Sequence, residues 1–292
     1  MSNILITGAG TGFGRESAMR LAEKGHVVIA GVEIASQVFD LQQEAKKRGI
    51  NLQVEKLDVT NAKDREKAWK WDIDILLNNA GIAEGGSVID IPEKNLRHQF
   101  EVNVFGTIFL TQGFARAMVK KKEGKIIFMT SMEGLVADPF SGPYAATKHA
   151  QEAFASSLNK EVKEFGIQVA TINPGPYLTG FNDQMYETWK NWEDDPEQRI
   201  FDYEKLAFPH MQFDPEPVYE LIVDLITGKT KQYRNLVPKA MRKQVQALQA
   251  AEWEMPQNST SGQRDEMVEK AYKMKPATPA KTSILDKVLS NF

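Results

Sequence analysis

The stretch Ile4-Leu5-Ile6-Thr7-Gly8-Ala9-Gly10-Thr11-Gly12-Phe13-Gly14 decides the fold of this chain of 292 residues. Its apolar start predicts a buried strand over residues 4–7, and the glycine-rich turn leads into a helix that continues to about residue 22. Glycines permit a tight turn and a close approach to a pyrophosphate, while the helix N-terminus offers free N–H groups. We therefore predict a nucleotide-binding turn at Gly8, Thr11, Gly12, Phe13 and Gly14. A purely structural turn is the alternative for such a motif in isolation.

Outward from this turn, short apolar runs alternate with helical stretches. Strands are expected at residues 4–7, 27–30, 57–59, 73–77, 125–129, 168–172 and 235–237. The first helix is expected to end near residue 22, and the others are expected at 38–48, 62–69, 93–119, 144–165 and 218–227. This alternation predicts an α/β fold, a Rossmann-like, doubly wound parallel sheet with helices on both faces. A single domain over residues 1–238 follows, with its ligand at the carboxyl ends of the strands.

The pattern changes after Pro174. Residues 181–213 are rich in aromatic side chains and methionine, which favours a substrate lid over about 180–215; core packing for the last strand is the alternative. Residues 239–292 read as a mostly helical C-terminal extension, with a helix at 241–253, a polar linker at 256–263, a break at 275–279 and a short segment at 284–289. We expect this extension to pack on the domain or on a neighbouring subunit.

Composition excludes several classes of protein. The formal net charge of −3 and a pI of about 5.9 leave no basic excess for nucleic acid. The chain has no cysteine, and its four scattered histidines form no chelating pair, so no metal site is expected. No apolar run approaches the roughly 20 residues that span a bilayer. The first strand starts too early for a targeting peptide, so we expect a cytoplasmic protein without a membrane partner.

Two further motifs follow predicted strands. The run Asn78-Asn79-Ala80-Gly81 would let the chain pass close to a flat cofactor, and its asparagines could cross-link neighbouring strands; alone, it is equally an ordinary turn. Asp58, at the end of the strand at 57–59, is suited to bind an adenine amino group. The alternative is a helix N-cap shared with Thr60 and Asn61.

The third motif is Tyr144-Ala145-Ala146-Thr147-Lys148, preceded by Ser131. A tyrosine and a lysine four residues apart share one helix face. A nearby ammonium stabilises the phenolate and lowers its pKa from about 10, which would make Tyr144 a general acid and base. Ser131 could hydrogen-bond a substrate oxygen. A surface tyrosine packed on a lysine stem is the alternative for this pair in isolation.

Taken together, these motifs resemble the short-chain dehydrogenase/reductase family, in its compact single-domain branch. The similarity covers about residues 3–180. The matching pieces are Thr7-Gly8-x-x-x-Gly12-x-Gly14, Asp58-Val59, Asn78-Asn79-Ala80-Gly81, Asn103, Ser131, Tyr144-x-x-x-Lys148, and Pro174-Gly175 with Thr179.

The resemblance implies roles for these positions. Tyr144 would exchange a proton with the substrate oxygen, and Lys148 would lower the pKa of Tyr144 and bind the nicotinamide ribose. Ser131 would hold the substrate oxygen, and Asn103 would help to seat a relay water. The remaining implied cofactor contacts are Val59, Asn79, Ala80, Gly81, Pro174, Gly175 and Thr179. The cofactor would be NAD or NADP and would supply the hydride.

Two departures from the family pattern matter. The stretch from Asp58 to Asn78 is short, so the helix within it should be clipped. The end of the second strand carries Glu33, which could bind the ribose 2′-OH and repel a 2′-phosphate, although it stands one residue late. The positions at which NADP-preferring members carry a basic residue hold Thr11 and Glu33 in this sequence. Arg15 is the only nearby cation, and we expect it to point away along the first helix. These residues favour NAD.

The predicted function is hydride transfer between NAD(P) and a fairly apolar secondary alcohol or ketone, a small-molecule substrate. Glu133 could face the pocket and favour a polar or cationic group, or could cap a turn. The alternative function is a non-catalytic, nucleotide-sensing regulator; a sugar-nucleotide epimerase would need a different glycine spacing. The resemblance also implies a homodimer or homotetramer, paired through the helices that begin near Glu93 and Tyr144.

Overall fold

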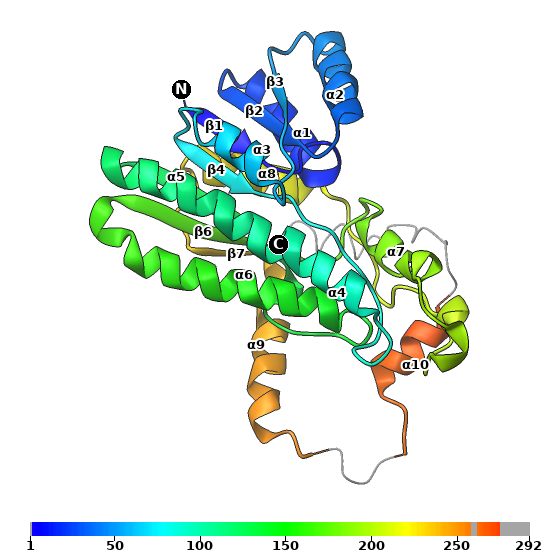
Figure 1. The fold of residues 1–292 in the computed structure, drawn as a ribbon. Coiled ribbons are helices and arrows are strands. Elements are labelled where there is room, and N and C mark those ends of the chain that lie inside the picture. Colours follow the sequence, from blue (N-terminus) through cyan, green and yellow to red (C-terminus); the bar gives the residue numbers. More distant parts are fainter. Residues whose placement is uncertain (1, 258–261, 275–292) are drawn as a thin grey trace.

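The computed structural model describes residues 2–257 and 262–274 of the chain. Its centre is one parallel sheet in the order β3-β2-β1-β4-β5-β6-β7, with every neighbouring pair parallel (Figure 1). This confirms the predicted doubly wound fold. The strands are β1 (Asn3–Ile6), β2 (Val27–Val32), β3 (Gln53–Lys56), β4 (Ile75–Asn78), β5 (Gly124–Met129), β6 (Ile167–Pro174) and β7 (Arg234–Val237).

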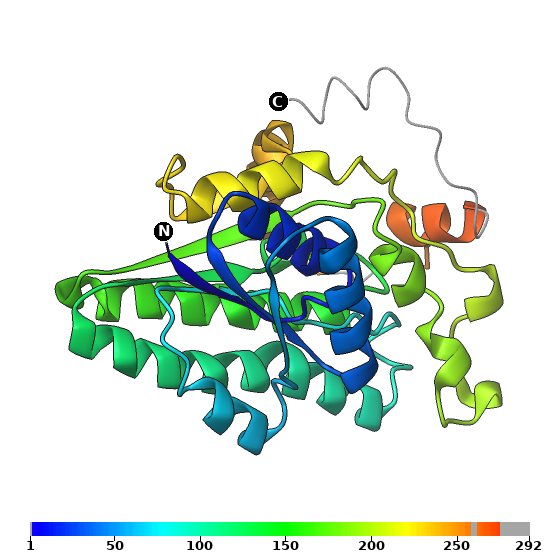
Figure 2. The ribbon, with the colours of Figure 1, turned by 90° about the horizontal axis from the view of Figure 1, so that it is seen from above.

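Helices cover both faces of the sheet, as the view from above shows (Figure 2). The core on one face includes side chains from α1 (Gly12–Glu23), α2 (Ala35–Lys47) and α8 (Glu216–Ile226). The opposite core includes side chains from α3 (Ala62–Ala68), α5 (Thr107–Lys121) and α6 (Gly142–Glu161). Central strands are buried on both sides, which explains why they appear in the sequence as continuous apolar runs. None of the described helices is long and apolar enough to cross a membrane.

The chain reverses its direction across the sheet between β1 and β4. The first three strands run outward to one edge, and β4 then returns to the other side of β1. A crevice opens where such a reversal occurs, outside the carboxyl ends of the strands. The glycine-rich turn follows β1 at this point, and residues 78–81 follow the adjacent β4.

Two predicted elements differ from the structure. The third strand ends at Lys56, so Asp58 and Val59 lie in the loop beyond it. The predicted long helix is α4 (Glu93–Phe100), a π-helical segment (Glu101–Gly106) and then α5. Within the π-helical segment, a Cβ on Gly106 would approach Val59 Cγ2 to 2.9 Å, so only glycine permits this contact. The π-helical segment therefore packs closely on the loop after β3, a contact that helical periodicity does not reveal.

The segment after β6 forms a layer of short turns with an aromatic interior. It contains α7 (Phe181–Met185) and three 3₁₀ turns (Thr188–Asn191, Pro196–Gln198 and Tyr203–Lys205). Its interior side chains include Met185, Tyr186, Trp192 and Tyr203, which pack together with Phe140 and Tyr144. This segment, the predicted lid, is thus packed against the body of the domain, and it is called the lid segment below.

The C-terminal extension adds two helices to the described structure. Helix α9 (Arg242–Ala251) packs through Val245 near residues 132–136. Helix α10 (Glu266–Lys273), which the sequence pattern did not predict, packs on the lid through Ala271, whose carbonyl accepts from Ala207 N at 3.1 Å. The hydroxyl of Tyr272 also accepts from Asp202 N at 3.0 Å. The segment predicted at 284–289 lies outside the described residues.

Candidate active site

A cavity of about 450 Å³ runs along the carboxyl ends of the strands. Its walls combine the glycine-rich turn, the loops after β3, β4 and β5, the start of α6 and the lid. Gly14 and Asn103 are the two predicted site residues that do not line it. The predicted residues that do are Gly8, Thr11, Gly12, Phe13, Glu33, Asp58, Val59, Asn79, Ala80, Gly81, Ser131, Tyr144, Lys148, Pro174, Gly175 and Thr179.

The glycine-rich turn is held against the loop after β4. Thr7 Oγ1 accepts from the backbone N–H groups of Asn79 at 3.0 Å and Ala80 at 2.9 Å, and Asn79 Nδ2 donates to Thr7 O at 2.9 Å. Gly8 has φ +62°, and a Cβ there would come within 2.6 Å of Ala80 Cα. A Cβ on Gly14 would come within 2.5 Å of Asn79 Nδ2. These glycines therefore allow the two loops to pack together and form one wall.

The start of α1 suits a phosphate group. Its N-cap residue, Thr11, makes no side-chain capping bond, and the first turn contains no acidic residue. The N–H groups and the positive dipole end of this helix are therefore directed toward the cavity without a competing anion. Together with the close-packed glycines, this end of the cavity fits the pyrophosphate of a dinucleotide.

The end of the cavity beyond β2 and β3 is acidic. Glu33 and Asp58 both line it, and Gln37 fixes the loop because its Oε1 accepts from Glu33 N at 3.1 Å. Asp58 Oδ1 accepts from Thr60 N at 2.8 Å, whereas Asn61 is the residue that N-caps α3. The capping alternative for Asp58 is therefore wrong as stated: Asp58 holds the preceding turn and still faces the cavity.

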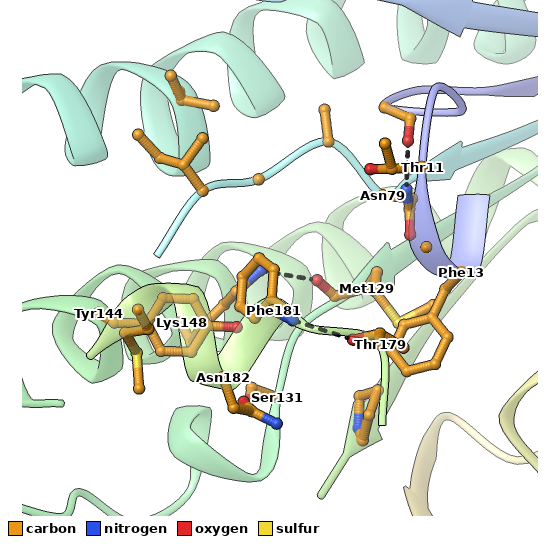
Figure 3. Close-up of a pocket in the computed structure, with 18 of the residues that line it drawn as sticks. Thr11, Phe13, Asn79, Met129, Ser131, Tyr144, Lys148, Thr179, Phe181 and Asn182 are labelled. Atoms are coloured by element: carbon orange, nitrogen blue, oxygen red, sulfur yellow. Dashed lines mark hydrogen bonds between the residues drawn. The ribbon is translucent and has the colours of Figure 1, made fainter. Parts of the chain in front are cut away.

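Tyr144 and Lys148 lie together on the first turns of α6, with Phe181 of the lid against the tyrosine (Figure 3). Tyr144 is 7% exposed and Lys148 is 3% exposed. The Nζ atom of Lys148 lies 5.5 Å from the centroid of the Tyr144 ring, and it donates to Met129 O at 3.0 Å and Gln151 Oε1 at 3.1 Å. Backbone and amide oxygens thus hold the ammonium next to the phenol.

The pKa of Tyr144 does not follow the predicted direction. Burial raises the pKa of this phenol above its ordinary value, and a hydrogen bond with Ser131 opposes the rise. Burial lowers the pKa of Lys148 to about 7, while the charge of Glu152 opposes that change. In this structure the loss of hydration outweighs the opposing effects of the Ser131 hydrogen bond on Tyr144 and of the Glu152 charge on Lys148.

Asn103 is buried outside the cavity. Its Oδ1 accepts from Ile82 N at 2.8 Å, and its Nδ2 donates to Ile82 O at 2.8 Å and Thr147 Oγ1 at 3.0 Å. Its backbone carbonyl accepts from Gln151 Nε2 at 2.5 Å, and Gln151 in turn accepts from Lys148. Asn103 is therefore connected to Lys148 through Gln151, and its side chain ties the π-helical segment to the loop after β4.

A buried polar network under the site was not predicted. The Glu152 carboxylate accepts from Thr130 Oγ1 at 2.6 Å, Asn173 Nδ2 at 2.7 Å and Arg234 Nη2 at 2.8 Å. Asn173 Nδ2 also donates to Ser131 O at 3.1 Å. The network connects α6 with the ends of β5 and β6 and with the start of β7, beneath Ser131. One signal in the sequence was available, because Glu152 lies one helical turn after Lys148 on the same face.

The family model described as short chain dehydrogenase matches residues 2–190. The uncharacterized oxidoreductase YusZ of Bacillus subtilis is 34% identical over 76% of this chain and 84% of its own length. The 3-ketodihydrosphingosine reductase of Bacteroides thetaiotaomicron is also 34% identical, over 62% of this chain and 65% of its own length.

Among solved structures, a short-chain dehydrogenase from Sphingobium yanoikuyae in complex with NADPH shares the fold with a TM-score of 0.68. It is 21% identical and covers 90% of this chain and 99% of its own. The match to the family model extends through β1, the glycine-rich turn, Ser131, Tyr144, Lys148 and Thr179. This chain belongs to the short-chain dehydrogenase family and is an oxidoreductase with a nicotinamide cofactor.

Proposed function

We propose that this chain interconverts a secondary alcohol and a ketone, with Tyr144 as the general acid and base. The observation that carries the proposal is that one cavity contains Ser131, Tyr144 and Lys148 at one end and an uncapped helix N-terminus at the other. A dinucleotide would span these ends, and its nicotinamide would supply or accept the hydride.

The three side chains have complementary tasks in this proposal. The phenol of Tyr144 exchanges a proton with the substrate oxygen. The hydroxyl of Ser131 donates a hydrogen bond to that oxygen and keeps it next to the phenol. The Lys148 ammonium stabilises the phenolate that forms when Tyr144 gives up its proton. Asn103 acts through Gln151 to hold Lys148, so we place it as a positioning residue.

The acidic end of the cavity supports a preference for NAD. Glu33 and Asp58 would repel a 2′-phosphate, and no lysine or arginine from the described residues lines this end. Two nearby cations are already paired, because Lys56 donates to Asp64 at 2.6 Å and Arg15 is bound to Glu44. The preference is measurable as the ratio of kcat/KM with NAD to that with NADP.

The lid supports a fairly apolar substrate. Phe181, Met185 and Phe208 line the cavity next to Tyr144, and the ring of Phe181 meets the Tyr144 ring edge to face at 5.7 Å between centroids. The printed name of the Bacteroides relative describes a reductase, so both directions of the reaction should be assayed.

A panel of alcohols and ketones, assayed with NAD and NADP separately, tests the function. We expect turnover that depends on Tyr144, measured from the absorbance of the reduced nicotinamide. Cofactor binding is measured in parallel by nucleotide fluorescence. Binding without turnover by any panel member would instead favour the non-catalytic regulator.

We also propose a dimer through the helices α5 and α6. Phe105 and Phe109 at the π-helical segment and the start of α5 are 41% and 42% exposed and stack at 6.1 Å, and Phe154 on α6 is 45% exposed. Exposed aromatic side chains on adjacent helices are typical of a contact surface. Light scattering on the wild type and on Phe109→Asp tests this: the mass should fall to that of one chain in the variant.

A further inference from the structure

Glu133 lies inside the cavity next to the reacting groups. It follows Ser131 by two residues in a 3₁₀ turn (Met132–Gly134), and its backbone N–H donates to Ser131 Oγ at 3.1 Å. Its side chain is half-buried and lines the same cavity as Tyr144. The turn therefore fixes the carboxylate at the substrate end, one short turn from the residue proposed to hold the substrate oxygen.

Among the described residues, only one oxygen of this carboxylate accepts hydrogen bonds. Glu133 Oε2 accepts from Ser141 Oγ at 2.8 Å and, at 3.4 Å, from Asp138 N. Within residues 2–257 and 262–274, Oε1 has no hydrogen bond and no cation pairs with Glu133; Oε1 is also not sealed in the interior. The second oxygen thus remains accessible from the cavity.

Its neighbours compensate the charge only in part, because Ser141 and the Asp138 N–H donate hydrogen bonds to the carboxylate but no cation among the described residues pairs with it. The closest acid, Asp138, is itself paired with His210 of the lid segment at 2.7 Å. Burial and the charge of Asp138 raise the pKa of Glu133 to about 8. The charge of Glu133 also raises the pKa of Tyr144, so the carboxylate acts on the phenol through space. A cation brought into this part of the cavity would relieve both repulsions.

Building on the proposed function, we infer that Glu133 determines specificity by binding an ammonium group that the substrate carries near its reacting carbon. The substrate class is then an amino alcohol or amino ketone with an apolar remainder against the lid. A neutral hydroxyl in the same place would donate one hydrogen bond but would leave the carboxylate charge without a counterion.

Three alcohols of similar size test this inference. They are 1-amino-2-octanol, 3-nonanol, in which a methyl group replaces the ammonium, and 1,2-octanediol, in which a hydroxyl replaces it. We expect the wild type to prefer the amine in kcat/KM by about tenfold over 3-nonanol, as a charge-assisted hydrogen bond provides. Glu133→Gln should remove most of this ratio. Glu187→Gln, an exposed lid acid outside the cavity lining, should leave the ratio unchanged.

Binding separates this inference from the proposed function. Calorimetry with the same alcohols is performed on the NAD-loaded Tyr144→Phe protein, with and without Glu133→Gln. Preferential, Glu133-dependent binding of the amine, together with a wild type that turns over none of the alcohols, would refute the proposed function and keep the ammonium site. Turnover with no preference for the amine, a preference for the diol, or a ratio that Glu133→Gln leaves intact would refute the ammonium site alone.

Discussion

The two halves of the cavity are built in different ways. The nucleotide half is built mainly from backbone: a glycine-rich turn, a helix N-terminus and a loop after β4, joined by hydrogen bonds to Thr7 and Asn79, with the acidic side chains of Glu33 and Asp58 at its far end. The substrate half consists of side chains from segments far apart in the chain, including Glu133, Tyr144, Phe181 and His210. The first half can bind a cofactor common to many enzymes, and the second half decides which substrate reacts. Substitutions should therefore affect the two halves separately.

The largest difference between the effect on catalysis and the effect on cofactor binding is expected from Tyr144→Phe. This change removes the proton-exchanging hydroxyl and leaves the ring that packs against Phe181. We expect kcat/KM to fall by about 10²-fold or more, the usual contribution of general acid–base catalysis, with the cofactor dissociation constant unchanged. Steady-state kinetics and nucleotide fluorescence measure the two quantities. If the variant keeps its activity, a residue other than Tyr144 exchanges the proton with the substrate.

A smaller effect, confined to the substrate half, is expected from Ala271→Asp. Ala271 is 1% exposed in the contact between α10 and the lid, so a carboxylate there should separate α10 from the aromatic cluster. We expect the KM for the alcohol to rise by about tenfold, equivalent to about 1.4 kcal/mol, with cofactor affinity retained. Ala247→Asp, at an exposed position on α9, is the matched control. An equal rise in KM in both variants would show that the contact between α10 and the lid does not affect substrate binding.

The converse change, confined to the nucleotide half, is Glu33→Gln. Removing the negative charge at the acidic end should lower the ratio of kcat/KM for NAD to that for NADP by a few-fold to about tenfold, because repulsion of the 2′-phosphate is reduced. Glu66→Gln, an exposed acid on α3, serves as the control. The prediction fails if the ratio in the wild type already favours NADP.

The last prediction concerns stability and pH without nucleotide. Because the pKa of Lys148 is lowered to about 7, the folded protein loses this proton above pH 7, whereas the unfolded chain keeps it until about pH 10.4. The unfolded state therefore binds more protons in that window, and the contribution of Lys148 to the free energy of unfolding rises with pH. Urea titrations should show this rise as a difference between the wild type and Lys148→Met. A difference that stays constant between pH 7 and 9 would mean that Lys148 keeps an ordinary pKa.

The nucleotide half was also the half that the sequence predicted. A tight turn between an apolar strand and a helix is decided by residues next to one another, so Gly8, Gly12 and Asn79 could be identified directly. Strand ends are less certain, which is why the strand ending at Lys56 was extended to Val59 in the prediction. The spacing of Tyr144 and Lys148 identified the pair but could not report how strongly burial acts on the two pKa values.

The substrate half depends on contacts between distant residues. The network around Glu152 joins the ends of β5 and β6 to the start of β7, and the docking of Ala271 on Ala207 joins two segments that α8, β7 and α9 separate in the chain. Neither produces a periodic pattern, because periodicity records only that a face is buried and not what buries it. The aromatic content of residues 181–213 indicated a lid, whereas the helical spacing of Val268, Ala271 and Tyr272 in α10 does not tell which surface that helix covers.

The contact between α10 and the lid has a consequence for the order in which the protein is made. The glycine-rich turn and its partners are synthesised early, and the sheet is complete once β7 has emerged. The aromatic side chains of the lid beside Tyr144 can pack against α10 only after Ala271 has left the ribosome. Since a domain generally folds as a unit once its elements have emerged, the sheet and its cofactor-binding wall can form before α10 is available. Selectivity for substrate would be the last property to mature.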